Sequence, residues 1–245
     1  MNIIITGCNG LIGSTLVKHF SNKENFKVFG FDNSKNSNLK HKNFDYFKVD
    51  VSNIDNVIKM RKYFDEKQIF IEGLINAHQY KPKGFLNADI FDMDIDMWNE
   101  IVSVNLSGVY FTCREFGKKM KSNKKGSIVN FASTYAVVSS NPELYENNSM
   151  GNPIAYTSSK GGVIALTRYL AANLGKYGIR ANSITPHGVY NNHEKQFIDK
   201  FSSMTPINRM MKVNEIIDPI ELLLTEKGSY INGSNLIVDG GWTIW

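Results

Sequence analysis

The chain has 245 residues, of which 42% are hydrophobic and 12% aromatic, so it can bury the core of a single α/β domain spanning residues 1–245. Its net charge of +5 comes from scattered lysines, without the arginine-rich stripe of nucleic-acid grooves, and no apolar run approaches the roughly 20 residues of a membrane span. We expect no signal peptide, because the first predicted strand begins at Asn2, and no disulfide, because the two cysteines lack metal or redox spacing. The expected protein is cytoplasmic, with reduced thiols and no metal, nucleic-acid or membrane partner.

Short apolar runs alternate with longer helical patterns along the chain. Strands are predicted near residues 2–6, 27–32, 45–49, 70–76, 126–132, 179–185 and 235–239, and helices near residues 11–21, 53–65, 94–121, 155–176 and 213–224. Several of these strands are apolar throughout, as expected where helices cover both faces of a parallel sheet. The order predicts a doubly wound, Rossmann-type α/β fold with a mainly parallel seven-stranded sheet and a ligand crevice at the carboxyl ends of its strands.

The stretch TGCNGLIG, residues 6–13, lies between the first predicted strand and the first predicted helix. Glycines at this point let backbone N–H groups and the positive end of the helix approach a pyrophosphate. A tight structural turn is the alternative for such a loop taken alone. The expected phosphate contacts are Gly7, Asn9, Gly10, Leu11, Ile12 and Gly13.

Asp32 ends the second predicted strand, where dinucleotide-binding folds place a carboxylate that accepts a hydrogen bond from the ribose 2′-hydroxyl. The same carboxylate repels a 2′-phosphate, which favours NAD over NADP as the cofactor. Lys35 lies close enough along the chain to offset that repulsion, so NADP stays open as the less favoured alternative.

Tyr156 and Lys160, in the sequence YTSSK, lie four residues apart at the start of a predicted helix and therefore share one face. The preceding Asn152 and Pro153 are typical of a helix start. A free tyrosine titrates near pH ~10, and a nearby cation together with an oxidised nicotinamide favours its ionised form. The pair is therefore a candidate acid/base centre, with an ordinary surface pair as the alternative.

These motifs together resemble the short-chain dehydrogenase/reductase family, in its short single-domain class, over essentially the whole chain. They are TGxxGxxG, Asn76-Ala77 after the fourth strand, Asn105 in VNLSG, Ser133 in NFAST, YTSSK, and the ending SYINGSNLIVDGG. The resemblance implies that Tyr156 is the catalytic acid/base and that Lys160 holds the nicotinamide ribose and assists Tyr156. It also implies that Ser133 orients the substrate oxygen and that Asn105 anchors a water in a proton relay.

The same resemblance implies further cofactor contacts along the crevice. They are Asp50 and Val51 beside the adenine, Asn76 and Ala77 beside the adenosine ribose, and Pro186, Gly188 and Val189 on the nicotinamide side. Two turns depart from the family pattern, because His78 follows Asn76-Ala77 and His187 separates Pro186 from Gly188. We expect both imidazoles at the polar rim, with a catalytic role as the alternative and His187 as a substrate contact.

Two irregular stretches, residues 139–153 and 187–209, follow predicted strands and border the crevice. Residues 139–153 make the interval between Ser133 and Tyr156 longer than is usual in the family, which predicts a substrate lid with Tyr145 as a contact. Its hydrogen-bonding groups suit a hydroxylated substrate, and a passive surface loop is the alternative. The lid sequence NPELYE, the loop TGCNGLIG and the ending DGGWTIW also resemble a bacterial group of flagellin-modification oxidoreductases associated with sugar biosynthesis for flagellar glycans.

The expected activity is NAD-dependent hydride transfer at a hydroxyl or keto carbon of a small polar molecule, a sugar or sugar phosphate. The glycine spacing resembles that of sugar-nucleotide epimerases and dehydratases, so an enzyme of that class with retained NAD is one alternative. A non-catalytic NAD-binding protein is another. The apolar run of residues 104–111, together with Trp242 and Trp245, predicts subunit contacts in a homodimer or homotetramer. Packing of these side chains within one subunit is the alternative.

Overall fold

The computed structural model describes residues 1–82, 90–146, 151 and 154–244. Its centre is one seven-stranded sheet in the order β3-β2-β1-β4-β5-β6-β7, and every pair of neighbouring strands is parallel. The strands are β1 (Asn2–Thr6), β2 (Lys27–Asp32), β3 (Phe44–Lys48), β4 (Gly73–Asn76), β5 (Gly126–Phe131), β6 (Ile179–Pro186) and β7 (Asn235–Val238). The order reverses between β1 and β4, which is where doubly wound sheets open a ligand crevice.

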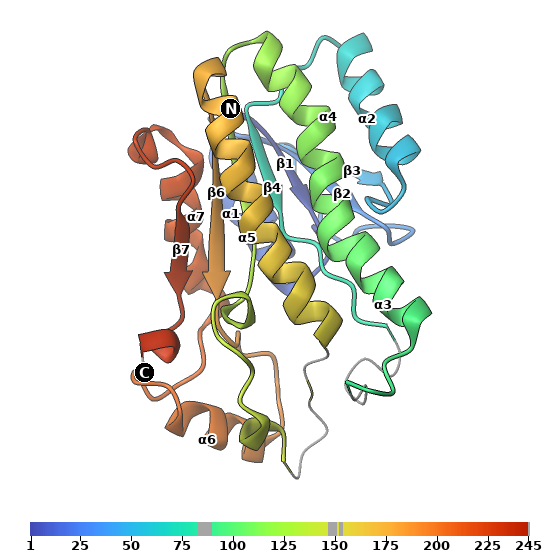
Figure 1. Cartoon of the computed structure of the whole chain (residues 1–245). Helices are drawn as coiled ribbons and strands as arrows, with labels where there is room; N and C mark the ends of the chain where they lie inside the picture. The colour runs from blue at the N-terminus through green and yellow to red at the C-terminus, as the bar shows by residue number, and fades with distance from the viewer. Residues whose placement is uncertain (83–89, 147–150, 152–153, 245) are drawn as a thin grey trace.

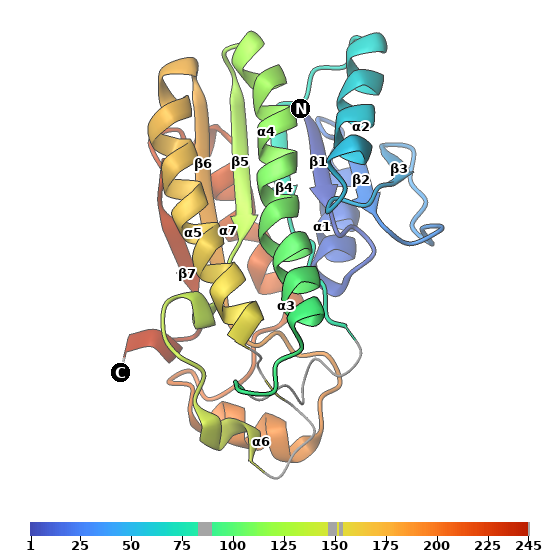
Figure 2. The same cartoon turned by 45° about the vertical axis from the view of Figure 1, so that its right-hand side comes forward.

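Helices cover both faces of this sheet (Figures 1 and 2). They are α1 (Leu11–Ser21), α2 (Ile54–Glu66), α3 (Ile95–Val102), α4 (Gly108–Ser122), α5 (Ile154–Leu174), α6 (Lys195–Ser203) and α7 (Ile217–Leu224). The α2, α4 and α5 helices lie on one face, α1 and α7 lie on the other, and α6 lies beyond the carboxyl ends of the strands. The Rossmann-type fold expected from the sequence is confirmed.

Full burial of both sheet faces explains the continuous apolar strands. Ile3, Ile4 and Ile5 of β1 are all completely buried. Because successive strand residues point to opposite faces, Ile4 packs with α2, α4 and α5, whereas its two neighbours pack with α1 and α7. Each such side chain contributes about 1.5–3 kcal/mol on burial.

The helix predicted over residues 94–121 is divided in the structure. After α3 the chain makes a π-helical turn over Ser103–Ser107 and then continues as α4. A π turn holds an extra residue relative to an α-helix, so the residues that share a face are offset by one between the two helices. Asn105 lies inside this turn and is completely buried.

The prediction of an irregular stretch over residues 187–209 was wrong in part, because it contains the α6 helix. The apolar face of α6, with Phe197 and Phe201, packs on Leu144 from residues 139–146 and on Trp242. We call residues 139–146 together with α6 the cap; a short 3-10 turn, Pro142–Tyr145, shapes its first part. The remaining residues of the expected lid, 147–150 and 152–153, lie outside the described residues.

Trp242 is 7% exposed and buried against the cap, so it packs within the subunit, contrary to the expectation of a subunit contact. Trp245 lies outside the described residues. Among the helices of the described part of the chain, none combines the length and the apolar character needed to cross a bilayer.

Candidate active site

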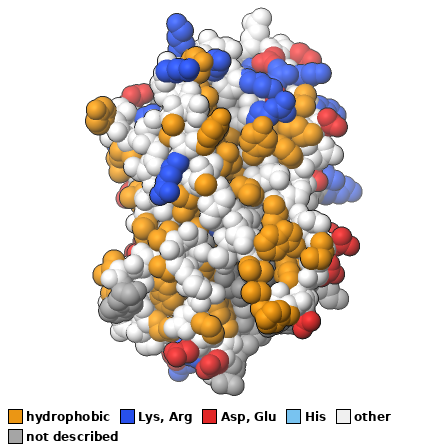
Figure 3. All heavy atoms as spheres, viewed as in Figure 1, with side chains coloured by type: hydrophobic (Ala, Val, Ile, Leu, Met, Phe, Trp, Pro, Cys, Tyr) orange, Lys and Arg blue, Asp and Glu red, His pale blue; other side chains and the backbone are white. Residues whose placement is uncertain are grey.

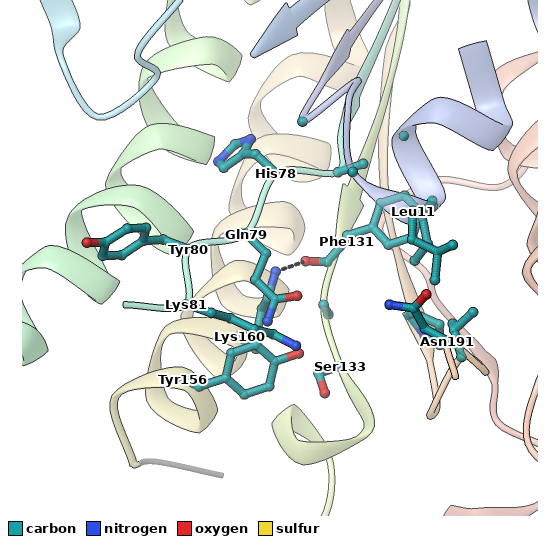
Figure 4. A pocket seen from close by; sticks show the side chains of 18 of the residues that line it. Leu11, His78, Gln79, Tyr80, Lys81, Phe131, Ser133, Tyr156, Lys160 and Asn191 are labelled. Atoms are coloured by element: carbon teal, nitrogen blue, oxygen red, sulfur yellow. Dashed lines mark hydrogen bonds between the residues drawn. The ribbon is translucent and has the colours of Figure 1, made fainter. Parts of the chain in front are cut away.

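A cavity of about 740 Å³ opens at the carboxyl ends of the strands. Its walls come from the glycine loop, the segments that follow β2, β3, β4, β5 and β6, and the first turns of α5. Residues that are far apart in the sequence meet there because all the parallel strands end at the same edge of the sheet. Figure 4 shows the part of this cavity around Tyr156 and Lys160.

The glycine loop is packed tightly against the end of β4. Gly7 has a φ of +66°, and a Cβ at this position would lie 2.6 Å from the Cα of His78. A Cβ at Gly13 would lie 2.0 Å from the carbonyl oxygen of Gly7, so both positions exclude side chains. The predicted residues that line the cavity here are Gly7, Gly10, Leu11, Ile12 and Gly13.

The N-terminus of α1 fits a phosphate group. Its N-cap residue is Gly10, no side chain caps the helix, and the first turn carries no acidic residue. The backbone N–H groups of this turn and the positive end of the helix therefore lack a side-chain acceptor at the cavity wall, as a bound pyrophosphate requires. Asn9 does not line the cavity: its backbone N–H donates to Asp32 and its amide donates to the carbonyl oxygen of Asn36, each at 3.1 Å.

The Asp32 carboxylate stands at the cavity wall at the end of β2. Its Oδ1 accepts hydrogen bonds from the backbone N–H and the hydroxyl of Ser34, and its Oδ2 accepts from Asn9. These bonds fix the carboxylate next to the glycine loop. Lys35 is exposed and is not among the described lining residues.

The other expected cofactor residues divide into two groups. Asp50, Val51, Ala77, Pro186, Gly188 and Val189 line the cavity. Asn76 instead lies behind its wall, 1% exposed, where it accepts a hydrogen bond from Thr112 at 2.8 Å and donates one to Asn130 at 2.9 Å. Its side chain thus points into the core, and its amide connects β4 to α4 and β5.

Ser133, Tyr156 and Lys160 meet at one point of the cavity (Figure 4). Ser133 follows β5, and the other two lie in the first turns of α5. Lys160 is 2% exposed; its Nζ donates to the carbonyl oxygen of Phe131 at 2.9 Å and lies 5.9 Å from the centre of the Tyr156 ring. Ser133 is hydrogen-bonded to Tyr156.

Burial favours the neutral forms of Tyr156 and Lys160. It raises the pKa of Tyr156, and the hydrogen bond with Ser133 opposes that change. It also lowers the pKa of Lys160, to about 8, with a smaller contribution from the positive charge of Lys81. An additional positive charge beside the phenol is therefore needed before Tyr156 can act as a base near neutral pH.

Asn105 lies under the cavity and not in its lining. Its Oδ1 accepts a hydrogen bond from the backbone N–H of Tyr80 at 2.8 Å. Its buried Nδ2 has no hydrogen-bond partner among the described residues. This arrangement leaves an amide donor available for a water molecule.

The two histidines that depart from the family pattern are both 7% exposed, so neither is at a solvated rim. His78 must donate from Nε2 to the carbonyl oxygen of Val104, at 3.0 Å, so its Nδ1 accepts from the Thr6 hydroxyl at 2.6 Å. Burial lowers the pKa of His78 to about 3. This neutral imidazole connects β1 and the end of β4 to the π-helical turn.

His187 forms part of the cavity wall next to the cap. Its Nδ1 is 2.8 Å from the Thr134 hydroxyl, and its ring centre is 4.3 Å from that of Phe201 and 4.1 Å from that of Trp242. Burial lowers its pKa to about 3, which makes it a poor proton carrier near neutral pH. Tyr145, the other expected substrate contact, also lines the cavity and shares a hydroxyl–hydroxyl hydrogen bond with Tyr135.

The sequence reading did not single out Lys81, Gln79 or Asn191, which all line the cavity. Lys81 and Gln79 lie in the segment that follows β4, and Asn191 lies in the segment that follows β6. Their positions a few residues after predicted strands could have indicated that they border the crevice. Among the described residues there is no group of three or more His, Cys, Asp or Glu side chains that could hold a metal ion.

A doubly wound sheet with an open helix N-terminus and a Ser-Tyr-Lys cluster at one cavity defines a nucleotide-dependent oxidoreductase. The model of a family described as enoyl-(acyl carrier protein) reductase matches residues 12–243, and the chain belongs to the short-chain dehydrogenase/reductase family. Post-translational flagellin modification protein A of Campylobacter coli is 25% identical over 248 residues, covering 98% of this chain and 97% of that protein.

Two further similarities concern a sugar-alcohol enzyme and a solved structure. The galactitol 2-dehydrogenase (L-tagatose-forming) of Cereibacter sphaeroides is 30% identical over 163 residues, covering 64% of this chain and 61% of that protein. A short-chain dehydrogenase from Leptospira borgpetersenii, solved with bound NAD⁺, superposes with a TM-score of 0.91 at 28% identity and covers 99% of this chain and 92% of the other. The chain is thus an oxidoreductase of this family.

Proposed function

We propose that the protein uses NAD to interconvert a hydroxyl and a keto group on a sugar or sugar phosphate. The observation that carries this proposal is the cluster of Ser133, Tyr156 and Lys160, which lies in the same cavity as the open N-terminus of α1. When bound, the nicotinamide supplies the hydride acceptor or donor.

In this proposal each side chain of the cluster has one task. Ser133 hydrogen-bonds the substrate oxygen, and Tyr156 removes the hydroxyl proton in oxidation or returns it in reduction. Lys160 holds the nicotinamide ribose and stabilises the ionised phenol, and Asn105 holds a water with its available Nδ2. Lys160 is 2% exposed and Tyr156 is partly buried, which limits the access of bulk water to the proton transfer.

We propose NAD as the preferred cofactor because the Asp32 carboxylate lines the cavity and Lys35 does not. The N-terminus of α1 would hold the pyrophosphate, and Asp50, Val51 and Ala77 would border the adenosine. The NAD⁺ found in the Leptospira structure supports the choice.

The substrate class rests on two relatives and on the polar groups of the cavity. One relative acts on galactitol and the other takes part in flagellin modification, which supports a role in glycan biosynthesis. Tyr145 of the cap and His187 line the substrate side and would contact hydroxyl groups.

Turnover tests the proposal directly. The protein is incubated with NAD or NADP and with a panel of sugar alcohols, sugar phosphates and nucleotide sugars, and NADH or NADPH is followed by absorbance. We expect net NADH formation that the substitution Tyr156→Phe abolishes. Isomerised product without net NADH would favour an epimerase with retained NAD, which the glycine spacing suggests. NAD binding without turnover of any compound would favour a non-catalytic protein.

We also propose a homodimer or homotetramer that buries the face formed by α3, α4 and α5. Figure 3 shows hydrophobic side chains gathered on this face. On it Tyr110 is 46% exposed and Tyr169 is 68% exposed. Large aromatic side chains are enriched in the cores of subunit interfaces, which supports this choice.

A further inference from the structure

Lys81 enters the cavity from the loop that follows β4. Figure 4 shows its side chain extending into the part of the cavity that Tyr156 and Lys160 line. Asn191 presents its amide from the opposite wall, on the loop that follows β6. Lys81 therefore occupies the substrate side of the cavity, whereas the glycine loop and Asp32 occupy the other side.

Charge is distributed unevenly between these two sides. The carboxylates among the described lining residues are those of Asp32, at the end of β2, and Asp50, which follows β3. The other side carries the ammonium groups of Lys81 and Lys160. Burial, with a smaller contribution from the charge of Lys81, lowers the pKa of both Lys160 and His193, so His193 adds little positive charge near neutral pH. The substrate side thus has an excess of positive charge.

The positive charge of Lys81 is not balanced within the described part of the protein, where it forms no ion pair or hydrogen bond. Lys81 as a whole is exposed, but the protein atoms around its ammonium partly desolvate it and lower its pKa. Most lysines extend into bulk water and escape this cost, which is the ordinary alternative for Lys81. An anion bound next to the ammonium would offset the desolvation.

Lys160 cannot take the same role, because its Nζ is buried and donates to the carbonyl oxygen of Phe131. We propose that Lys81 binds an anionic substituent of the substrate, a carboxylate or a phosphate, on the side of the molecule nearest Tyr156. This inference rests on the proposed function and narrows it, because neutral polyols would then be poorer substrates than sugar acids or sugar phosphates. The Asn191 amide would hydrogen-bond the same part of the substrate from the opposite wall.

A binding experiment tests Lys81 without turnover. Succinate and inorganic phosphate are titrated by calorimetry into the protein, with and without saturating NAD. We expect Lys81→Gln to weaken binding of the better anion about 10- to 100-fold, since one charge-assisted hydrogen bond is lost, and Lys81→Arg to retain most of it. Lys59→Gln, which removes an equal charge from the exposed side of α2, is the matched control. Equal affinity in Lys81→Gln and the unaltered protein would overturn the inference.

A kinetic experiment distinguishes the two anion sources and separates this inference from the proposed function. NADH formation is measured with galactitol, galactonate and galactitol 1-phosphate. We expect one anionic compound to have a higher kcat/KM than galactitol. We expect Lys81→Gln to lower the ratio of these two kcat/KM values about 10- to 100-fold. Tyr156-dependent oxidation with a ratio that Lys81→Gln does not change would overturn the inference and leave the proposed function standing. If none of the three compounds is oxidised, the calorimetric result decides the inference.

Discussion

Tyr156 and Lys160 show how burial opposes charge on both members of an acid/base pair. Each is less stable in its charged form inside the cavity than in water, but a phenolate and an ammonium formed together would stabilise each other. The charge on one group therefore depends on the charge on the other, and the two groups titrate as a coupled pair and not independently. Ser133, hydrogen-bonded to Tyr156, biases this titration toward the phenolate.

Tyr156→Phe removes the ionisable oxygen and keeps the ring. We expect kcat to fall about 10²- to 10⁴-fold, the usual contribution of a general acid/base, with little change in NADH affinity. Steady-state kinetics and a fluorescence titration with NADH measure the two quantities. Retention of most of the activity would show that another group transfers the proton.

Lys160→Met keeps the length of the side chain and removes its charge. Because the folded-state pKa of Lys160 is lowered from 10.5 to about 8, the unfolded chain binds this proton more strongly between those pH values. Below pH 8 the buried ammonium costs about 3 kcal/mol of stability, part of it from Lys81, and this cost disappears as the pH rises.

We therefore expect Lys160→Met, although inactive, to have a higher free energy of unfolding than the unaltered protein at pH 7, when both are measured without NAD. This difference in free energy should narrow by pH 10. Urea unfolding across this pH range measures it. A stability difference that does not change with pH would contradict the assigned pKa.

Asp32→Asn keeps a hydrogen-bond acceptor beside the glycine loop but removes the negative charge. We expect the preference for NADH over NADPH to narrow about tenfold, because the repulsion of a 2′-phosphate is relieved and a charged acceptor for the ribose is lost. Fluorescence titrations with both nucleotides measure the ratio. An unaltered protein that already binds NADPH more tightly would refute the role of Asp32.

At the scale of elements, the cap joins segments that are distant in sequence over the substrate side of the cavity. Leu144 from residues 139–146 is completely buried against Phe197 and Phe201 of α6. Tyr145 carries the same segment to the cavity wall, where it meets Tyr135. Packing of Leu144 therefore fixes the position of a group that faces the substrate.

Leu144→Ala leaves a hole in this small cluster, and large-to-alanine changes in a core cost about 2–5 kcal/mol. We expect the KM for the substrate to rise while NAD affinity stays nearly unchanged, because the cap lies away from Asp32 and the glycine loop. Steady-state kinetics and an NAD titration measure both. Leu223→Ala, a completely buried position of α7 under the sheet, is the matched control and should lower Tm without raising KM.

The predictable elements were those whose burial leaves a regular pattern in the sequence. Continuous apolar runs located the strands. Because parallel strands end at one edge of the sheet, the strand positions also placed the motif residues Ser133, Tyr156 and Lys160 at that edge. The π-helical turn at Ser103–Ser107 was not predictable, because one extra residue hardly changes the apolar periodicity. The α6 helix was missed because only a few apolar residues, facing a local cluster, identify it.

Side-chain directions were the least accessible to sequence reasoning. Asn76 was expected at the cofactor, yet its amide is satisfied by Thr112 and Asn130 in the core. Lys81 is the opposite case: it lines the cavity but was not expected there, because nothing in the surrounding KPKG distinguishes it from other surface lysines. Which way such residues point depends on contacts between distant segments, and local sequence does not encode those contacts.

At the scale of the whole molecule, the order of the sheet separates two kinds of recognition. Strands β1, β2 and β3 end beside the glycine loop, Asp32 and Asp50, and strands β5 and β6 end beside the Ser-Tyr-Lys cluster and the cap. Changes on one side can therefore alter substrate choice without rebuilding the nucleotide side. This separation is the physical basis for expecting independent effects in the cap and Asp32 variants.

Tyr110→Glu introduces a carboxylate into the exposed face of α4. If this face is buried between subunits, the charge has no partner there and we expect the protein to dissociate toward a smaller species. Sedimentation velocity of the unaltered protein and the variant measures the change. Lys62→Glu, which adds a carboxylate to the exposed side of α2, is the control and should leave the assembly intact. A monomeric unaltered protein would refute the proposed assembly.

The π-helical turn also constrains which insertions and deletions the gene can tolerate. An α-helix turns by about 100° per residue, and the wider π turn takes up one extra residue without rotating α3 relative to α4. Loss of one codon within Ser103–Ser107 would therefore restore a regular α-helix and keep α3 on its present face. A further inserted codon, which the turn does not take up, would rotate α3 by about 100°, and Ile101, now completely buried, would leave its packing position. The gene can thus lose a codon here with less damage to the packing of α3 than it can gain one.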